Sequence, residues 1–184
     1  ALSLGLLLGC GKKSPEPTEL TLTPGMKTAS KAYDEGRYAD AAKLYTAELA
    51  TEEAKPEPSW EQLTSINTFL GMALYFAGQY DKALAHHQKA LAIQIKQLGP
   101  DHPDVAMSYI NIGSVHDKKG EDDKALEHYQ KSLAIDLKTK GADHADVAQN
   151  YNNIGLVHAR KGDNDKALEY YQKSLAILLK QLGP

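Results

Sequence analysis

Apolar and polar residues follow one another along this chain with the period of an α-helix. Between positions 103 and 119, four residues occur at spacings of four, three and four: Val105, Tyr109, Ile112 and His116. These spacings place the four side chains on one face of a helix. Pro103 suits the first helical turn, and Gly120 suits the left-handed position that ends a helix. The pattern therefore predicts a helix from about 103 to 119.

A second helix is predicted after a short turn. Residues 122 to 139 carry an apolar stripe that we expect to be buried: Ala125, Leu126, Tyr129, Leu133 and Leu137. Asp122 and Asp123 open this segment and Lys138 closes it, which complements the helix dipole. Because only a few residues join the two segments, we expect them to pack as an antiparallel hairpin.

The hairpin is one unit of an internal repeat with a period of 42 residues. The last two units agree, without a gap, at 28 of 42 positions, and the second unit shares Asp-Lys-Ala-Leu with the third, at Asp81 and Asp123. Self-similarity at this period is typical of stacked repeat proteins, because one hairpin cannot bury its apolar face alone. The four units cover about 26–56, 57–98, 99–140 and 141–182.

A glycine stands in the middle of the first helix of three units, at Gly71, Gly113 and Gly155. A glycine inside a helix costs about 1 kcal/mol relative to alanine. Its recurrence therefore indicates a gain in packing. We expect the second helix to approach closely at this point, with a small residue opposite each glycine: Ala83, Ala125 and Ala167.

The repeat resembles the tetratricopeptide repeat, whose signature of an aromatic residue, Leu-Gly, Ala and a second aromatic residue is matched here by Tyr109, Ile112, Gly113, Ala125 and Tyr129. The usual repeat has about 34 residues, whereas the 42-residue unit is similar to the repeats of kinesin light chain. The resemblance implies an all-α fold, a right-handed superhelical solenoid of antiparallel helix hairpins over 26–184. It also implies a general scaffold for protein interactions.

In that family, the first helix of each unit lines a concave face that binds peptides. The resemblance places these groove positions at Thr68, Phe69, Met72 and Phe76, at Asn111, Ser114 and Lys118, and at Asn152, Asn153, Leu156 and Arg160. The amides of Asn111 and Asn153, which occupy equivalent positions, can donate to and accept from an extended peptide backbone.

The other groove positions imply side-chain contacts. Lys118 and Arg160 are equivalent cations, suited to acidic side chains or a C-terminal carboxylate. Phe69 replaces the asparagine in the second unit and indicates an apolar pocket at that end. The alternative interpretation for all of these residues is a solvated helix face.

The first ten residues are apolar and end in Cys10. They are too few to span a bilayer, which needs about 20, but they match the end of a signal peptide. Leu7-Leu-Gly-Cys10 resembles a bacterial lipobox, which implies a lipid on Cys10 and a membrane-anchored lipoprotein at the cell envelope, on its periplasmic or outer-surface side. Residues 11–25 read as a flexible linker. The alternative is an apolar terminus with a chance buried cysteine.

Two terminal features predict that the sequence is a piece of a longer protein. An initiator Met and a basic segment, which a signal peptide should have, are both missing before the apolar run. Gly183-Pro184 matches Gly99-Pro100, the opening of the third unit, so further repeats are expected to follow.

Composition narrows the function further. A formal charge of −3, from 21 basic and 24 acidic residues, gives no basic footprint, so nucleic acid is not an expected partner. The sequence contains neither a phosphate-binding glycine loop nor Gly-x-Ser-x-Gly, so we expect no enzyme activity and no cofactor. The ten tyrosines are unusual beside two phenylalanines and one tryptophan.

Six of the seven histidines recur one repeat apart, as the pairs His86 and His128, His102 and His144, and His116 and His158. Repetition explains these pairs, so no metal site is expected. His102 and His144 should bond to local backbone before the first helix of their units. His116 and His158 should lie on the packed face, with a polar edge toward a neighbouring unit.

Three functions remain open from the sequence. The first is a lipid-anchored scaffold that binds a peptide or partner protein on the concave face. The second is the N-terminal anchor or sensor region of a larger enzyme or signalling protein. The third is a structural element that self-associates end to end through an exposed apolar face of its terminal repeat.

Overall fold

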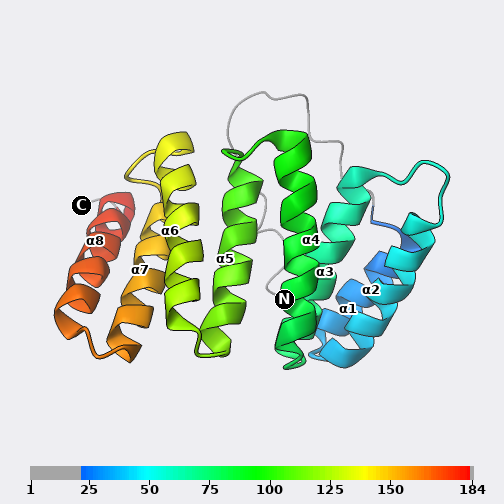
Figure 1. The fold of residues 1–184 in the computed structure, drawn as a ribbon, viewed down its shortest axis with the longest axis horizontal. Helices are drawn as coiled ribbons and strands as arrows, with labels where there is room; N and C mark the ends of the chain where they lie inside the picture. The colour runs from blue at the N-terminus through cyan, green and yellow to red at the C-terminus, as the bar shows by residue number, and fades with distance from the viewer. Residues whose placement is uncertain (1–21, 183–184) are drawn as a thin grey trace.

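The structure, a computed structural model, describes residues 22–182, so the predicted lipobox and most of the predicted linker lie outside the described residues. Eight helices make up this part of the chain: α1 (Pro24–Asp34), α2 (Tyr38–Glu53), α3 (Trp60–Phe76), α4 (Tyr80–Leu98), α5 (Pro103–Lys118), α6 (Asp122–Thr139), α7 (Ala145–Arg160) and α8 (Asn164–Leu182). They stand side by side in a row from α1–α2 at one end to α7–α8 at the other (Figure 1).

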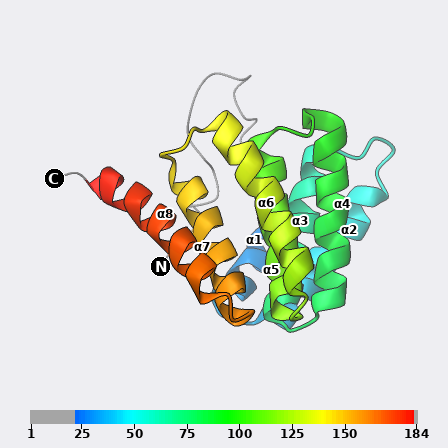
Figure 2. The same ribbon diagram turned by 60° about the vertical axis from the view of Figure 1, so that its left-hand side comes forward.

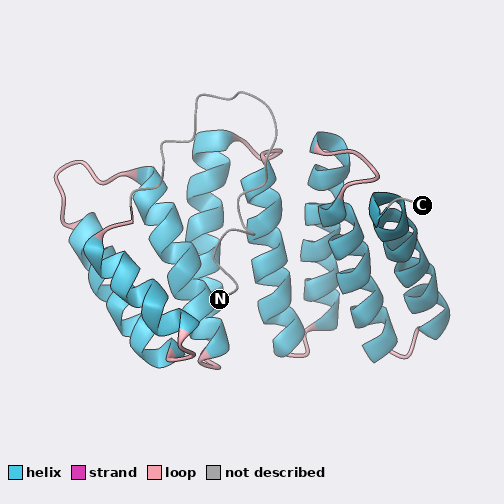
Figure 3. Ribbon diagram, turned by 180° about the vertical axis from the view of Figure 1, so that it is seen from behind, coloured by secondary structure: helices cyan, strands magenta, loops and turns pink. Residues whose placement is uncertain are grey.

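Each helix packs on the helix before it and the helix after it, which makes a solenoid of antiparallel hairpins. Seen from behind, residues 22–182 contain helices and connecting loops but no strand (Figure 3). The predicted all-α repeat architecture is therefore confirmed. The two helices predicted over 103–119 and 122–139 are also confirmed, with α5 ending one residue earlier.

The helix starts follow from capping side chains. His102 and His144 each accept a hydrogen bond at ring Nδ1 from a backbone N–H two residues later, at 3.2 Å, as predicted. The hydroxyl of Thr23 accepts from the N–H of Met26 at 3.1 Å. This cap, with Pro24 in the first turn, starts α1 inside the predicted linker segment.

The turn from the first to the second helix of a unit depends on a glycine with positive φ. Gly120 has φ of 72° and its equivalent Gly162 has φ of 81°. The N–H of Glu121, just after the first of these glycines, donates to the carbonyl of His116 at 2.9 Å, which closes the end of α5. The predicted left-handed helix end is thus confirmed.

The buried face of α6 differs from the prediction at one residue. Ala125 and Tyr129 are buried and Leu126 and Leu133 are half-buried, but Leu137 is exposed. The helix lies between α5 and α7, so its buried face has to serve both neighbours. The residues that continue this buried face are Ser132, Ile135 and Asp136.

The mid-helix glycines do allow close approach, but the group opposite is an aromatic ring. A Cβ atom on Gly113 would lie 2.7 Å from the ring of Tyr129, and one on Gly71 would lie 2.6 Å from the ring of His87. The equivalent ring at Gly155 belongs to Tyr171. The backbone oxygen of Ala167 also lies 3.3 Å from a Cβ atom placed on Gly155, so the expected alanine is opposite this glycine. At all three glycines, however, the nearest group is the ring one turn after the alanine, and this ring needs the space.

Successive hairpins meet through buried polar pairs. The hydroxyl of Ser108 on α5 donates to the side-chain oxygen of Gln94 on α4 at 2.5 Å. One repeat later, the amide of Asn150 donates to the carboxylate of Asp136 at 2.8 Å, and Lys140 lies 2.8 Å from the same carboxylate. Buried polar groups require such partners, so these two junctions each favour one register of stacking.

The side of α8 that faces away from α7 has no helix packed on it within the described chain (Figure 2). Leu168 and Leu175 are 57% and 55% exposed. Their equivalents on α6, Leu126 and Leu133, are half-buried because they pack against core residues of the last hairpin. The last hairpin therefore presents an uncovered apolar face.

Candidate functional site

The asparagines of α3, α5 and α7 fall into two groups. Asn67 and Asn150 are buried and bonded: the Asn67 amide donates to the Leu63 carbonyl at 2.7 Å, and its oxygen lies 2.9 Å from the ring of His86. Asn111 and Asn153 are half-buried, and Asn152 is exposed; none of the three has a hydrogen-bond partner among residues 22–182. The expected groove asparagines therefore keep their amides available.

Two of the remaining groove residues predicted on α3 and α5 already contact other side chains of the protein. Ser114 accepts a hydrogen bond from the hydroxyl of Tyr129 at 3.3 Å. The ring of Phe69 stacks on Tyr45 at 5.8 Å between centroids, so the apolar position predicted there is filled by the first hairpin. Met72, three residues after Phe69, is half-buried.

The two equivalent cations have different surroundings. Arg160 bonds to Asp117 at 2.6 Å and to Asp122 at 2.8 Å, both in the preceding hairpin. The hydrogen bond with Asp117 is the main cause that raises the pKa of Arg160, so this guanidinium stays charged and its charge is paired with two carboxylates of the preceding hairpin. Lys118 is exposed and has no carboxylate partner within the described chain. Only Lys118 keeps the free positive charge that the sequence predicts for both.

Sequence reasoning missed a cluster of aromatic rings at the turn ends of the first two hairpins. Phe76 is 52% exposed; its ring stacks on Tyr38 at 5.1 Å and meets the edge of Tyr33 at 5.8 Å. Tyr75 contacts Phe76 at 5.1 Å and Tyr80 at 5.8 Å. The excess of tyrosine is the available signal, but no local pattern assembles rings from four helix ends.

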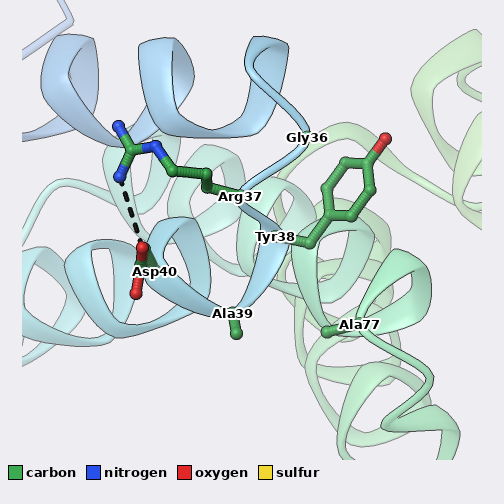
Figure 4. A pocket seen from close by; sticks show the side chains of 6 residues that line it. All are labelled: Gly36, Arg37, Tyr38, Ala39, Asp40 and Ala77. Atoms are coloured by element: carbon green, nitrogen blue, oxygen red, sulfur yellow. Dashed lines mark hydrogen bonds and ion pairs between the residues drawn. The ribbon is translucent and has the colours of Figure 1, made fainter.

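An open depression of about 290 Å³ adjoins this cluster through Tyr38. Figure 4 shows the side chains of Tyr38 and Arg37 extending to opposite sides, with Arg37 paired with Asp40. The guanidinium of Arg37 also bonds to Glu35 at 2.7 Å. Its charge is thus already matched, and none of the predicted groove residues lines this depression.

His116 and His158 are buried on the packed face, but their polar edges point into their own units. Nδ1 of His116 lies 2.6 Å from the carboxylate of Glu121, and Nδ1 of His158 lies 3.3 Å from that of Asp163. The prediction of contact with a neighbouring unit is therefore wrong, because the next turn of the same hairpin lies closer. The bond from His116, with Lys124 and Lys119, lowers the pKa of Glu121 to about 2.

Residues 22–182 lack two features that would point to other functions. No group of three or more His, Cys, Asp or Glu side chains in this range is placed to hold a metal ion. No helix in the same range combines the length and apolar character that crossing a bilayer requires.

Several solved structures have a similar fold. BtubC (BKLC) from P. vanneervenii is 26% identical with a TM-score of 0.72; the match covers 81% of this chain and 59% of that one. The Rap conjugation gene regulator of plasmid pLS20, solved in complex with the Phr* peptide, is 19% identical with a TM-score of 0.71, over 83% of this chain and 41% of that one. This chain thus spans less than two thirds of either protein.

A kinesin light chain from Podosopora anserina with nearly identical TPR-like repeats is 18% identical, with a TM-score of 0.58, over 87% of this chain and 96% of that one. Comparison with curated proteins gives no match. The family model for the tetratricopeptide repeat matches residues 61–138 and 118–180. The chain therefore belongs to the tetratricopeptide repeat family.

Proposed function

We propose that this protein is an interaction scaffold that binds an extended peptide or partner segment along α3, α5 and α7. One observation carries the proposal: Asn111 and Asn153, one repeat apart, have no partner among the described residues, whereas the buried Asn67 and Asn150 are bonded internally. Amides at a regular spacing can pair with the backbone of a peptide whatever its side chains. The proposed role is binding, not catalysis.

The similar structures support this proposal at the level of the fold. The Rap regulator of plasmid pLS20 forms a complex with the Phr* peptide, so a protein of similar fold binds a peptide ligand. At 19% identity the likeness extends to the fold alone, and the peptide for this chain has to be found by experiment.

The experiment is a binding comparison on a synthetic library of extended peptides. Replacing Asn111 and Asn153 together with alanine should weaken the selected peptides about tenfold, because two backbone hydrogen bonds are lost. The matched control replaces Gln130 and Gln172, two exposed amides at equivalent positions on α6 and α8. Equal binding by both double variants, with unchanged helicity, would refute the role of the asparagines.

We also propose membrane anchorage through a lipid on Cys10, which would place the protein at the cell envelope. The support is the sequence Leu7-Leu-Gly-Cys10 alone, since this segment lies outside the described residues. Labelling with radioactive palmitate should be lost in Cys10→Ser. Labelling that persists in this variant would rule out the anchor.

A second candidate function, end-to-end self-association, is favoured by the uncovered face of α8. Leu168, Leu175 and Leu179 are each more than half exposed. If this face pairs two copies, light scattering should show a mass that rises with concentration, and Leu168→Glu with Leu175→Glu should abolish the rise. A constant monomer mass in the unmodified protein would exclude this function.

A further inference from the structure

The aromatic cluster around Phe76 is built from the ends of four helices. Tyr33 lies in the last turn of α1 and Tyr38 begins α2, while Phe76 ends α3 and Tyr80 begins α4. The rings of Phe76 and Tyr38 stack and the other four contacts are edge-on, at centroid distances of 5.1 to 5.8 Å. These are favourable geometries for aromatic pairs, so the rings hold one another in place. With Tyr75, these residues form what we term the aromatic platform.

Unlike a cluster in the protein core, the aromatic platform is exposed to solvent at Phe76. Phe76 is 52% exposed, although its ring has three aromatic neighbours. Elsewhere in the chain this register position carries a charged residue, Asp34, Lys118 or Arg160. An exposed phenyl face at a position that is otherwise charged points to a contact with a partner.

The four tyrosines add hydrogen-bond donors around that face. No residue within 22–182 bonds to the hydroxyl of Tyr33, Tyr38, Tyr75 or Tyr80. Burial raises the pKa of Tyr33 to about 12, and burial and the charge of Asp117 raise that of Tyr75. The hydroxyls of Tyr33 and Tyr75 therefore stay protonated and can donate to carbonyl oxygens.

The charge beside the platform restricts the ligand further. Asp34 follows Tyr33 and is exposed, and no cation pairs with it in the described chain. Two of the nearby cations are matched, Arg37 by Glu35 and Asp40, and Lys119 by Asp81. Lys31, one turn before Asp34 on α1, is exposed and has no carboxylate partner in the described chain. Asp34 is thus an open carboxylate beside the platform, and a basic side chain of a ligand complements it.

We propose that the aromatic platform binds an extended proline-rich segment of a partner protein that carries a basic residue beside its prolines. Such a segment forms a polyproline II helix, which leaves its carbonyl groups without internal partners. Flat aromatic faces pack against the proline rings, and phenol hydroxyls donate to the free carbonyls. Asp34 then pairs with the basic residue. This inference rests on the proposed function, since it names the ligand of one end of the same face.

The test measures binding of a fluorescein-labelled oligoproline peptide with one terminal arginine, by fluorescence anisotropy. The unmodified protein should bind it about tenfold more tightly than the same peptide with its prolines changed to alanine. Phe76→Lys, which installs the residue found one repeat later, should weaken binding about tenfold. Tyr75→Phe, which removes only a hydroxyl, should weaken it about threefold. Leu137→Lys, at an exposed leucine on α6 outside both the platform and the proposed groove, serves as the control.

The outcomes separate this inference from the proposed function. Equal binding of the proline and alanine peptides, or no effect of Phe76→Lys with an unchanged melting temperature, would overturn it. If Phe76→Lys fails to fold, the Tyr75→Phe result decides alone. If library peptides bind and depend on Asn111 and Asn153 while oligoproline does not bind, the scaffold stands and the proline ligand is wrong.

Discussion

Arg160 and Phe76 occupy equivalent positions two repeats apart, and both contact the hairpin before their own. Arg160 does so through ion pairs and Phe76 through aromatic packing. Arg160 bonds to the residues 43 and 38 positions before it, Asp117 and Asp122. Phe76 contacts the residues at the same two offsets, Tyr33 and Tyr38, through its ring. One structural position thus joins neighbouring hairpins by ion pairs near one end of the solenoid and by aromatic packing near the other.

This relationship predicts a difference in salt dependence. Arg160→Leu should lower stability by about 1 kcal/mol at low salt, with the loss shrinking as salt screens the two ion pairs. The measurement is the melting temperature as a function of sodium chloride concentration. Lys118→Leu is the matched control, because that cation has no carboxylate partner in the described chain and its removal should leave the salt dependence unchanged. Parallel salt curves for both variants would contradict the prediction.

Gly113→Ala should destabilise the protein despite the better helix propensity of alanine. The new Cβ atom would lie 2.7 Å from the ring of Tyr129, which has to move. Overpacking of this kind costs about 1–3 kcal/mol, against a gain in propensity of about 1 kcal/mol. Urea unfolding measures the difference. The same substitution in a Tyr129→Leu background should cost less, and a stabilised single variant would show that the ring is not the constraint.

The pH dependence of stability should weaken in His87→Tyr. Burial lowers the pKa of His87 to about 4 from an ordinary 6.5, so between pH 4 and 6.5 the unfolded chain binds the proton and the folded chain does not. The contribution of His87 to the free energy of unfolding is therefore greatest above pH 6.5, and it falls by up to about 3 kcal/mol toward pH 4. Tyrosine is the residue at the equivalent position of the next repeats, Tyr129 and Tyr171.

The free energies of unfolding at pH 7 and pH 4.5 test this substitution. Between pH 7 and pH 4.5, the free energy of unfolding should fall less in the variant than in the unmodified protein. It will retain some dependence, because burial also lowers the pKa of His128 to about 4. Identical losses in the two proteins would show that His87 is not a source of acid sensitivity.

Asp136→Ala should cost about 2–4 kcal/mol, because it leaves the buried amide of Asn150 and the ammonium of Lys140 without their carboxylate. The equivalent positions one repeat earlier carry a different hydrogen-bonded pair, Gln94 with Ser108, which suggests a compensating double substitution. The double variant Asp136→Gln, Asn150→Ser reproduces that pair and should recover most of the loss. Thermal and urea unfolding of the variants provide the comparison, and a double variant as unstable as Asp136→Ala would refute the exchange.

The candidate site could be predicted only in part. The equivalence of Asn111 with Asn153 is visible in the repeat, and their lack of partners agrees with a binding role. The ion pairs of Arg160 could not be predicted, because Asp117 and Asp122 become its partners only after two hairpins stack. Phe76 could be assigned to the groove, but the four tyrosines around it belong to separate helix ends.

The sequence by itself determined the period, the helices of each hairpin and their capping residues, because helical spacing and local hydrogen bonds depend on residues a few positions apart. His102 and Gly120 illustrate this, since each acts on its own helix end. The tertiary structure decided which ring fills the space above Gly113 and which cation stays free. Those contacts join residues from different helices or hairpins, and their geometry is set by how the hairpins pack.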